Sequence, residues 1–470
     1  LERALFGIIG EIEIHVAAQQ RSEREGVGAR LELIPAFRLL EHEVDTRFFA
    51  GQSVVEILTT LLGTRLGAYE RSIDTSALAG TYAARDYCVQ FRESTFDFCN
   101  RIMEEEGIAY FFVPDPDAQR ERMVLVDAND QYAAAGLLVP GPLVVECDRP
   151  DQLDRESVQA LAWREAAAAN QVITRGYNYK LGNPVDEGEA TQPGGPRPIV
   201  HTRVHDALQR QIIDDPVGDP EALAFDGSAL EQQVPLARRL LESLRIAAAL
   251  GRGRSNAIGF AAGATIELEQ ALPGGARELL LTRVVHHVSR VEGNEDARDF
   301  SYSNEFECVG RDQPYRPPRR TPKPRVHGVQ TGVVIGKKPD EVHTDRFGRI
   351  QVAFPIHDHA AAEPQAGSCW LRVAQVWAGQ GFGAMVIPRV GMEVVVAFVD
   401  GDPDSPLVTG CVYNGTNLPP YELPSELSKS TFKTSSTPGG EDFSELRIED
   451  AKGSEQVFVR AQRRMDLRVQ

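Results

Sequence analysis

The chain has 470 residues, of which 42% are hydrophobic and 25% are charged, a composition typical of globular proteins with several domains. The formal net charge of −18 argues against a general nucleic-acid binder, because contacts with phosphates require an excess of Lys and Arg. The sequence contains no run of about 18 apolar residues, which excludes a membrane-spanning helix.

The first residues, LERALFGIIGEIEIHV, carry Glu inside their apolar run, and this pattern does not fit a signal peptide. We therefore expect the protein to be made in the cytoplasm, where an acidic surface keeps it soluble. The chain begins with Leu rather than Met. We expect the natural N-terminus to lie upstream.

The first third of the chain predicts short helices among strands. GARLELIPAF (28–37) alternates as a strand does. A helix follows Ser53, whose capping box with Glu56 marks its start, and Gly63 is expected to end it. A second helix has Ser94 as its cap, Asp97 in its first turn, an apolar stripe at Phe96, Cys99 and Met103, and Gly107 as its stop. IAYFFV, PDPD and MVLVD then predict a hairpin.

The middle of the chain is less regular. Residues 183–198 are expected to form a polar loop rich in Gly and Pro. Residues 229–250 predict a longer helix that begins near Pro235, because proline is tolerated only in the first turn. ATIELEQ (264–270) and ELLLTRVVHHVSRV (278–291) return to strand patterning.

Residues 311–325 form the clearest boundary. This segment has five prolines, five arginines and one lysine against one acid, so it predicts an extended linker. Its basic side chains allow two arrangements, docking on an acidic neighbour or a solvated tether.

After the linker the sequence is almost purely β. GRIQVAFPI places Ile350, Val352, Phe354 and Ile356 on one face, and MEVVVAFV (392–399) is apolar on both faces, as in the centre of a small barrel. DGDP (400–403) then predicts the turn of a hairpin. Together these patterns predict a small Greek-key barrel. The tail alternates apolar and charged residues around the turn KGSE, and a strand pair of this kind needs other chains to pack on.

The six cysteines are scattered through the sequence without a C-x-x-C pair. We expect buried, reduced thiols rather than a disulfide framework. They are Cys88, Cys99, Cys147, Cys308, Cys369 and Cys411.

Two glycine-rich stretches imitate nucleotide-binding loops. GVVIGKK (332–338) is one residue short between its glycines and has no Ser or Thr after the lysine, so strand and turn is the preferred interpretation. GQGFG (379–383) does not open a helix in a βαβ unit, which disfavours a dinucleotide site.

Asp400, Asp402 and Asp404 have the spacing of a calcium loop. Ser405 stands where that loop needs Gly, and Cys411 stands where it needs a bidentate Glu. A hairpin turn with solvated acids is therefore the preferred interpretation.

Among the histidines, His357 and His359 could both bind a metal, but no third ligand has a supporting spacing. His286 and His287 lie on opposite faces of a strand and cannot share a site directly. The sequence contains no H-E-x-x-H or G-x-S-x-G motif. A pair of carboxylates remains open, because such pairs need not be close in sequence. We predict no catalytic, cofactor-binding or metal-binding residue.

Two of the three tryptophans, Trp370 and Trp377, stand just before Gly379, Gly381 and Gly383. Large rings beside glycines fit a sealed structural corner or a contact between subunits, because glycine lets backbones approach closely. A sugar or nucleotide pocket is the disfavoured alternative, since the barrel region has no basic groove and sugar binding would require exposed tryptophans.

Several long stretches resemble the VgrG family, the spike proteins of bacterial type VI secretion systems, which is similar to the hub and needle proteins of contractile phage tails. ARDYCVQFRESTFDFCNRIMEEEGIAYFFV (84–113) is similar to the hub signature of the family. TDRFGRIQVAF, SCWLRVAQVWAGQGFGAMVIPRVGMEVVVAFVDGDPDSPLVTGCVYNG and LRIEDAKGSEQVFVRAQRRMD are similar to its barrel and needle-base signatures, in the family's order. Residues 145–260 match only loosely, and IHDHAA (356–361) departs from the pattern.

The resemblance implies a mainly β protein. Residues 1–310 would be a hub of two β-barrel-like subdomains with inserted helices, from which N-terminal strands are missing. The remaining parts would be a Pro/Arg-rich linker (311–326), an OB-fold barrel (327–412), a neck (413–440) and the start of a trimeric β-helix needle (441–470).

The resemblance also implies a structural spike rather than an enzyme. Such a homotrimer would cap an Hcp-type secretion tube, puncture the target membrane and carry effector toxins, their adaptors and a tip protein of the PAAR-repeat family. It would reside in the bacterial cytoplasm before secretion, without cofactors and without nucleic acid. The alternative is a phage-tail-like, lysozyme-type enzyme that degrades cell walls, although residues 413–442 run directly from barrel to needle and leave no room for a catalytic domain.

Overall fold

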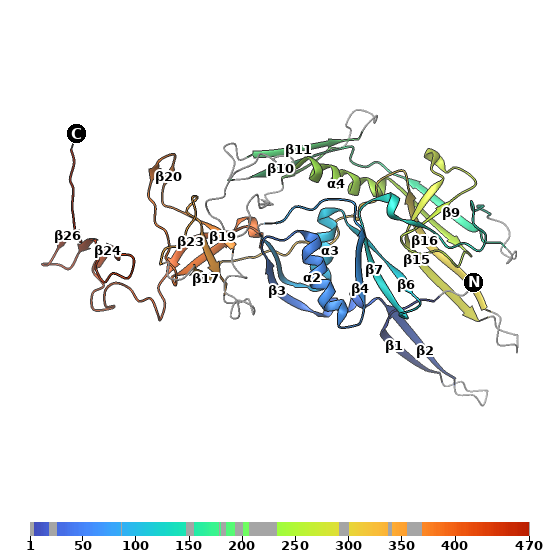
Figure 1. Ribbon diagram of the computed structural model, residues 1–470, viewed down its shortest axis with the longest axis horizontal. Helices are drawn as coiled ribbons and strands as arrows, with labels where there is room; N and C mark the ends of the chain where they lie inside the picture. The colour runs from blue at the N-terminus through green and yellow to red at the C-terminus, as the bar shows by residue number, and fades with distance from the viewer. Residues whose placement is uncertain are drawn as a thin grey trace.

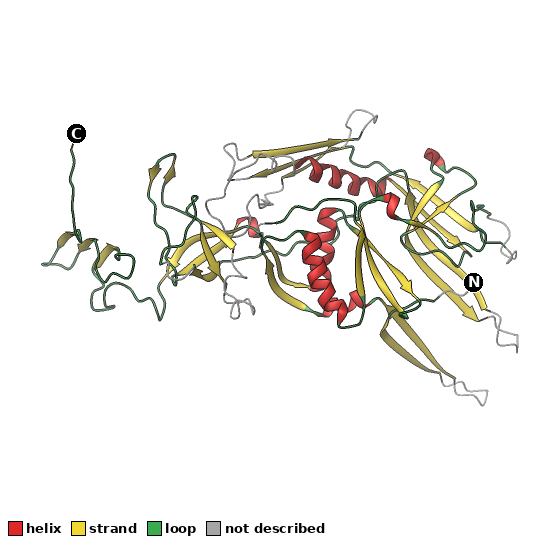
Figure 2. Cartoon of the chain, viewed as in Figure 1, coloured by secondary structure: helices red, strands yellow, loops and turns green. Residues whose placement is uncertain are grey.

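The computed structural model describes residues 4–17, 26–85, 87–146, 155–177, 179, 185–192, 201–205, 233–290, 300–336, 341–354 and 369–469. Strands dominate the chain, which confirms the expected mainly β fold (Figure 2). A large N-terminal body, a small barrel and a group of C-terminal strands follow one another along the long axis of the molecule (Figure 1). Among the helices that the structure describes, none combines the length and apolar character needed to span a bilayer.

The first part of the expected hub packs two helices against short sheets. β1 pairs with β2, β3 pairs with β5, and β4, β7 and β6 form a three-stranded sheet. The elements are β1 (Ile8–Ala17), β2 (Gly26–Ile34), α1 (Ala36–Leu39), a 3₁₀ turn (Leu40–His42), β3 (Val44–Phe49), α2 (Val54–Gly67), β4 (Ser72–Ala77), β5 (Cys88–Ser94), α3 (Thr95–Glu106), β6 (Ala109–Asp115) and β7 (Arg120–Val126). The predicted strand over 28–37 therefore ends at Ile34, and the predicted hairpin of β6 and β7 is confirmed.

The capping box of α2 forms as predicted. The backbone N–H of Glu56 donates to the Ser53 hydroxyl, and the N–H of Ser53 donates to the Glu56 carboxylate at 2.7 Å. The prediction that Gly63 ends this helix is wrong, because the helix continues to Gly67. Leu66 lies fully in the core, and burying its side chain outweighs the cost of a glycine inside a helix.

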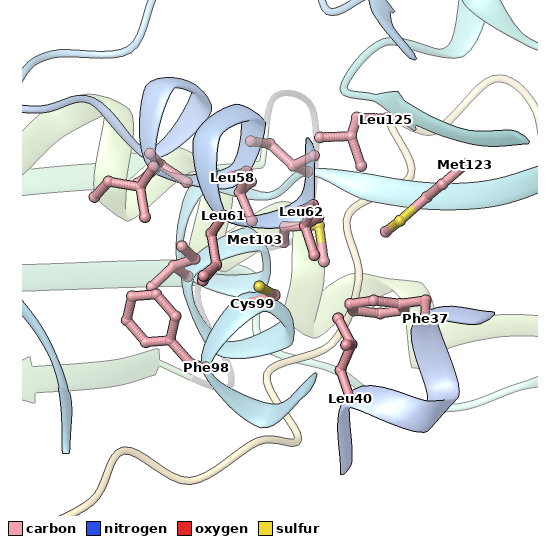
Figure 3. Close-up of a cluster of buried hydrophobic side chains, with 14 of the residues drawn as sticks. Phe37, Leu40, Leu58, Leu61, Leu62, Phe98, Cys99, Met103, Met123 and Leu125 are labelled. Atoms are coloured by element: carbon pink, nitrogen blue, oxygen red, sulfur yellow. The ribbon is translucent and has the colours of Figure 1, made fainter. Parts of the chain in front are cut away.

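Helix α3 follows its predicted boundaries. Ser94 caps the N-terminus by accepting from the N–H of Asp97 at 3.0 Å, and Gly107 ends the helix in the left-handed conformation with φ 71°. Cys99 and Met103 on its apolar stripe pack against Leu58 and Leu62 of α2 in the main core (Figure 3). Local sequence signals predict this helix correctly, because its cap, its stop and its apolar stripe agree with the face that the core buries.

The second part of the expected hub contains a six-stranded sheet in the order β8-β14-β15-β16-β13-β9 and a three-stranded sheet in the order β11-β10-β12. Their elements are a 3₁₀ turn (Asn129–Gln131), β8 (Ala133–Ala134), β9 (Val158–Glu165), β10 (Gln171–Tyr177), β11 (Val185–Thr191), β12 (His201–His205), α4 (Gln233–Arg245), two 3₁₀ turns (Ile246–Ala248 and Pro273–Gly275), β13 (Ala249–Ser255), β14 (Ala264–Glu267), β15 (Glu278–Arg290) and β16 (Phe300–Gly310).

Two predictions in this part need correction. Residues 183–198 are not wholly a loop, because β11 pairs antiparallel with β10 from Gln171 opposite Thr191 to Tyr177 opposite Val185. The helix predicted over 229–250 is α4, whose third residue is Pro235, as expected for a start near that proline; it ends at Arg245 rather than at 250, and residues 229–232 lie outside the described residues. α4 packs Leu240 and Leu241 against Val172 of β10. β10 is thereby held in the core and offers its edge to β11, a pairing that the polar sequence of β11 does not predict.

Five strands close into a barrel in the order β17-β18-β19-β23-β22. They are β17 (Gln330–Ile335), β18 (Ile350–Ala353), β19 (Cys369–Val373), β22 (Glu393–Phe398) and β23 (Pro406–Val412), with a 3₁₀ turn (Val399–Gly401) joining the last two. Ile350, Val352 and Phe354 fill its interior as predicted, while Ile356 lies outside the described residues. The two faces of β22 are not equally buried. Val394 and Val396 point into the barrel and are buried, whereas Val395 on the other face is only half-buried.

The remaining strands lie beyond or beside the barrel. β20 (Ala378–Gly379) and β21 (Phe382–Gly383) form a short hairpin that projects from it (Figure 1). β24 (Lys429–Lys433), β25 (Glu445–Glu449) and β26 (Gln456–Arg460) form a separate antiparallel sheet near the C-terminus. β24 lies in the residues expected to form the neck, β25 and β26 lie in those expected to begin the needle, and none of the three joins the sheet of the barrel.

Candidate functional site

The C-terminal sheet exposes its apolar face. The register places Leu446 opposite both Phe432 and Val459, and Ile448 opposite Val457, so these five side chains share one face. All five are exposed. Apolar side chains are thus on the outside of this sheet, and no strand among the described residues pairs with the outer edges of β24 and β26. A face of this kind requires a covering partner.

The opposite, polar face of the same sheet is already covered. Tyr421 from the neck donates its hydroxyl to the Glu445 carboxylate at 2.5 Å and accepts from Arg447 at 3.0 Å. Thr431 donates to the same carboxylate at 2.8 Å. Although burial opposes it, the hydrogen bonds from Tyr421 and Thr431 lower the pKa of Glu445 below its ordinary value. The neck therefore fixes which face of the sheet stays open.

The linker docks on the hub and barrel, which decides between the two arrangements that the sequence left open. Arg316 donates to the Glu242 carboxylate at 2.9 Å and to the backbone oxygen of Gly107 at 3.1 Å. The backbone N–H groups of Arg320 and Thr321 both donate to the Glu104 carboxylate at 2.9 Å. A Pro-rich segment that cannot form a ladder is thus held extended by side chains of α3 and α4.

Lys323 of the linker occupies the turn that resembled a calcium loop. Its ammonium lies 2.7 Å from Asp402 and 2.6 Å from Asp404, and all three side chains are mostly buried. Asp404 also accepts from the N–H of Val89 in β5 at 2.7 Å. The prediction of solvated acids is therefore wrong for Asp402 and Asp404 and fits only Asp400, which is exposed. The two carboxylates hold a lysine that joins barrel, linker and hub.

Burial and the neighbouring charges shift the pKa values of Lys323 and Asp402 in this joint. Burial alone would lower the pKa of Lys323, but the carboxylates of Asp404 and Asp402 outweigh it and raise that pKa above its usual value. Burial raises the pKa of Asp402, and the nearby ammonium of Lys323 offsets this only in part. The lysine therefore stays charged, and its ammonium limits how far burial raises the pKa of Asp402.

A small apolar cluster completes the joint between hub and barrel. Val89 and Phe91 of β5 pack with Val326 at the end of the linker, and Phe398 of β22 lies against them. Tyr179 makes a second contact with the barrel, where Arg349 donates to its hydroxyl at 2.9 Å and Arg372 lies over its ring at 4.3 Å. These contacts indicate a fixed rather than a flexible connection.

The tryptophans beside the glycines have different surroundings. Trp370 is half-buried and packs on His343, with ring centres 5.0 Å apart. Trp377 contacts Phe382 edge-on, with ring centres 5.5 Å apart. Because 64% of Trp377 is exposed, the prediction of a sealed corner is wrong for this residue. The glycines do permit close approach: a Cβ on Gly379 would meet the Phe382 ring at 2.4 Å, and one on Gly383 would meet the Trp377 carbonyl oxygen at 2.4 Å.

The remaining candidates form no composite site in the part of the chain that the structure describes. GVVIGKK begins as strand β17, as predicted, and its last two residues lie outside the described residues, as do His357 and His359. His286 lies beside the Tyr302 hydroxyl at 2.7 Å, while His287 is exposed. No group of three or more His, Cys, Asp or Glu residues gathers there as metal ligands.

The cysteines follow their prediction in part. Cys88, Cys99 and Cys308 are buried free thiols, and burial raises the pKa of Cys88 to about 11 and that of Cys308 to about 12. Cys411 is also free, but it is exposed, against expectation. It follows Gly410 at the end of β23, where the strand leaves the barrel interior. Cys147 and the side chain of Cys369 lie outside the described residues.

Sequence reasoning missed Lys323, Tyr421 and Tyr179 as contact residues. Lys323 carried a usable signal, since it is the only lysine in a linker of arginines, and the turn at 400–404 has three acids without a visible partner. Tyr421 and Tyr179 carried no signal, because their partners are distant in sequence.

Three family models match consecutive parts of the chain. The model of the phage tail baseplate hub matches residues 1–292, the type VI secretion system/phage-baseplate injector OB domain matches 330–413, and the bacteriophage T4 gp5 C-terminal trimerisation domain matches 430–470. The exposed apolar sheet thus lies in the part that is similar to a trimerisation domain, and the closed barrel lies in the part that is similar to an OB domain.

Solved structures show the same fold. The E. coli c3393 protein, a component of the type VI secretion system similar to T4 tail proteins gp27 and gp5, matches with a TM-score of 0.56 and 20% identity over 87% of this chain and 84% of that chain. A Francisella PdpA-VgrG complex matches with a TM-score of 0.54 and 9% identity over 96% of this chain and 73% of that chain.

Curated relatives share more sequence. The Pseudomonas aeruginosa type VI secretion system spike protein VgrG4b is 34% identical over 96% of this chain, and spike protein VgrG5 of the same organism is 35% identical over 96%. The chain spans about half the length of these relatives, 54% and 55%. The Vibrio cholerae actin cross-linking toxin VgrG1 is 32% identical over 93% of this chain, which spans 38% of it. The chain belongs to the phage tail baseplate hub family, and over nearly its whole length it is similar to VgrG spike proteins of type VI secretion systems.

Proposed function

We propose that the chain is one of three identical subunits of a type VI secretion spike. The observation that carries this proposal is the open apolar face of Phe432, Leu446, Ile448, Val457 and Val459, in the segment that is similar to a trimerisation domain. Three copies would bring these faces together and pair the free edges of β24 and β26 between chains. The tail sheet would then be completed only in the trimer.

Within this proposal the parts have separate tasks. Residues 1–310 form the hub that sits on an Hcp-type tube, 311–326 link hub to barrel, 327–412 form the barrel, 413–440 form the neck, and 441–470 begin the needle. The docked linker supports a rigid axis, because Lys323 connects the barrel turn to β5 of the hub through Asp404. A rigid axis suits a part that is pushed into a target membrane.

We propose a structural rather than a catalytic role for this chain. In support, the matched segments 1–292, 330–413 and 430–470 leave only short stretches between them, smaller than an ordinary catalytic domain. The toxin named among the relatives is much longer than this chain, and its activity is not transferred to it. Incubation with purified peptidoglycan should release no soluble fragments, and measurable release would restore the lysozyme-type alternative.

The proposed partners follow from the same assembly. Effector toxins with their adaptors and a PAAR-repeat tip protein would be carried on the spike, and the fold likeness to a PdpA-VgrG complex supports such cargo. The spike would assemble in the bacterial cytoplasm and be delivered outside the cell or into a target cell, as the relatives' designation as secretion spike proteins supports.

Trimer formation is tested by light scattering on the purified chain. We expect a mass near three times 51.7 kDa, and replacement of Leu446 by Asp should shift the protein to monomer, because a charge would be buried without a partner. Ser454→Asp adds the same charge in the exposed turn between β25 and β26 and should leave the mass unchanged. A wild-type chain that stays monomeric at high concentration would contradict the proposal.

A further inference from the structure

The hairpin that projects from the barrel carries a second exposed apolar surface, here named the arm. Its exposed residues are Val376, Trp377, Phe382, Met385 and Val386. Met385 is 80% exposed, and no charged residue occurs from 374 to 388. An uncharged surface of this kind is unusual on a chain with a net charge of −18 and indicates a protein contact.

The arm is a built element with a defined shape. Gln375 donates to the backbone oxygen of Val386 at 3.0 Å and accepts from its N–H at 2.9 Å, and the N–H of Ala384 donates to the carbonyl of Trp377 at 2.9 Å. The edge-on contact of Trp377 with Phe382 closes its tip. Because the arm is already ordered in the single chain, a contact through it costs little conformational entropy.

The base of the arm is attached to the loop that connects β24 and β25 of the C-terminal sheet. Arg389 donates to the backbone oxygen of Ser435 at 2.7 Å. Glu341 accepts from the N–H of Val390 through its backbone oxygen at 3.0 Å and from the N–H of Gly439 through its carboxylate at 2.5 Å. The arm is therefore continuous with residues 430–470, which are similar to a trimerisation domain.

The neck just before β24 also exposes four large apolar side chains, here named together the neck patch. This neck patch consists of Tyr413, Leu418, Leu423 and Leu427, and Leu418 and Leu427 are more than two-thirds exposed, at 72% and 75%. Since both the arm and the neck patch stay exposed, neither covers the other within one chain. The chain thus presents two different apolar surfaces, and both precede its trimerisation segment in the sequence.

A threefold ring needs this combination. In a ring each subunit uses one surface to contact the next subunit and a different surface to receive the previous one, unlike a twofold dimer, in which a single surface meets itself. We propose that the arm of each copy packs on the neck patch of the adjacent copy around the threefold axis. This inference rests on the proposed trimer and names a contact for it outside the needle sheet.

A carbohydrate is the less suitable occupant of the arm. Sugar sites combine a ring platform with several polar side chains that fix the hydroxyl groups. The arm offers only Gln375 and Gln380, and Gln375 is already engaged with the backbone of Val386. An apolar partner surface such as the neck patch matches the arm better.

Cross-linking of the full chain tests the contact. In a background with Cys147, Cys369 and Cys411 replaced by Ser, Met385→Cys is combined in turn with Leu418→Cys, Leu423→Cys and Leu427→Cys and treated with a short bismaleimide. We expect at least one pair to give a covalent species of three chains on a denaturing gel. Each single variant should stay at one chain, because the facing position on the neighbouring subunit then carries no cysteine.

The outcomes separate this inference from the proposed trimer. If light scattering shows three chains but no pair is linked, or if Met385→Cys alone gives dimers because the arms meet one another, the arm–neck contact is wrong while the trimer stands. A monomeric chain overturns both. Binding of soluble peptidoglycan sugars to the arm, detected as a shift of Trp377 fluorescence that is lost in Trp377→Phe, would also overturn the contact.

A second variant pair gives an independent measurement. Met385→Glu should raise the concentration at which the trimer dissociates by at least about tenfold, because the contact would bury an unpaired charge. Gln380→Glu places the same charge at an exposed polar position of the arm and should leave the dissociation concentration unchanged. Equal behaviour of both variants would refute the contact.

Discussion

Replacement of Lys323 by Met tests the joint between hub and barrel most directly. Met keeps the length and apolar stem of the side chain but removes the ammonium that lies within 2.7 Å of Asp402 and within 2.6 Å of Asp404. Two mostly buried carboxylates would then face each other without a cation. Removing one partner of a buried ion pair typically costs about 3–5 kcal/mol of stability.

The same magnitude follows from the cost of neutralising one carboxylate. The simplest relief is uptake of a proton, and at pH 7 this costs about 1.36 × 3.1 ≈ 4 kcal/mol for a carboxyl whose ordinary pKa is about 3.9. At pH 5 the same step costs about 1.36 × 1.1 ≈ 1.5 kcal/mol. The variant's folded state holds a carboxyl of raised pKa and binds more protons than its unfolded state, so its stability falls as the pH rises.

Hydrogen exchange gives a local assay for this joint. The N–H of Val89 donates to Asp404, so its exchange reports opening of the contact between β5 and the barrel turn. We expect Lys323→Met to speed this exchange by roughly a hundredfold to a thousandfold at pH 7, and by about tenfold at pH 5 after correction for the intrinsic rate. Urea denaturation of wild type and variant at both pH values gives the corresponding free energies of unfolding.

A rescue variant separates charge from shape. Lys323→Met combined with Asp402→Asn and Asp404→Asn removes the unpaired charges, and the Asn amide oxygen can still accept from Val89. This triple variant should recover more than half of the lost stability and lose the dependence on pH. The reasoning would be refuted if Lys323→Met cost less than about 1 kcal/mol at pH 7, below the range for breaking a buried ion pair, or if its cost did not change between pH 5 and pH 7.

Three further predictions concern residues that the sequence assigned differently from the structure. Gly63→Ala should stabilise the protein by about 0.5–1 kcal/mol in thermal denaturation, because Gly63 lies inside α2 with open space around it, whereas Gly107→Ala, at φ 71°, should be destabilising. Trp377→Ala should change the stability of the single chain by less than about 0.5 kcal/mol, since the ring is exposed; a loss of several kcal/mol would mean that the ring is buried. Cys411 should react with a maleimide in the native protein while Cys88 reacts only after unfolding, and mass spectrometry of labelled peptides would reveal the reverse order.

Local signals predicted the parts of the fold in which a few neighbouring residues decide the conformation. The capping box at Ser53 and the cap and stop of α3 at Ser94 and Gly107 are of this kind. The alternation of the tail predicted strands without a partner, and the exposed apolar face of Leu446 and Ile448 confirms it.

Predictions failed where distant residues decide the outcome. Gly63 was expected to end α2, but the core buries Leu66 beyond it. β11 was expected to be loop, because its polar sequence does not show that β10 offers a complete row of backbone partners. The acids of the barrel turn were expected to be solvated, because their partner, Lys323, belongs to a linker whose docking cannot be predicted from its composition.

The inverted burial of the C-terminal sheet has a consequence for the life of the newly made chain. Before its partners bind, a subunit carries a sheet with an exposed apolar face and two open edges. Such surfaces promote aggregation and incorrect strand pairing. The net charge of −18 opposes random encounters between subunits, since like-charged molecules repel one another at long range. Trimer assembly therefore has to be faster than aggregation. This requirement favours subunits that associate soon after synthesis, at high local concentration.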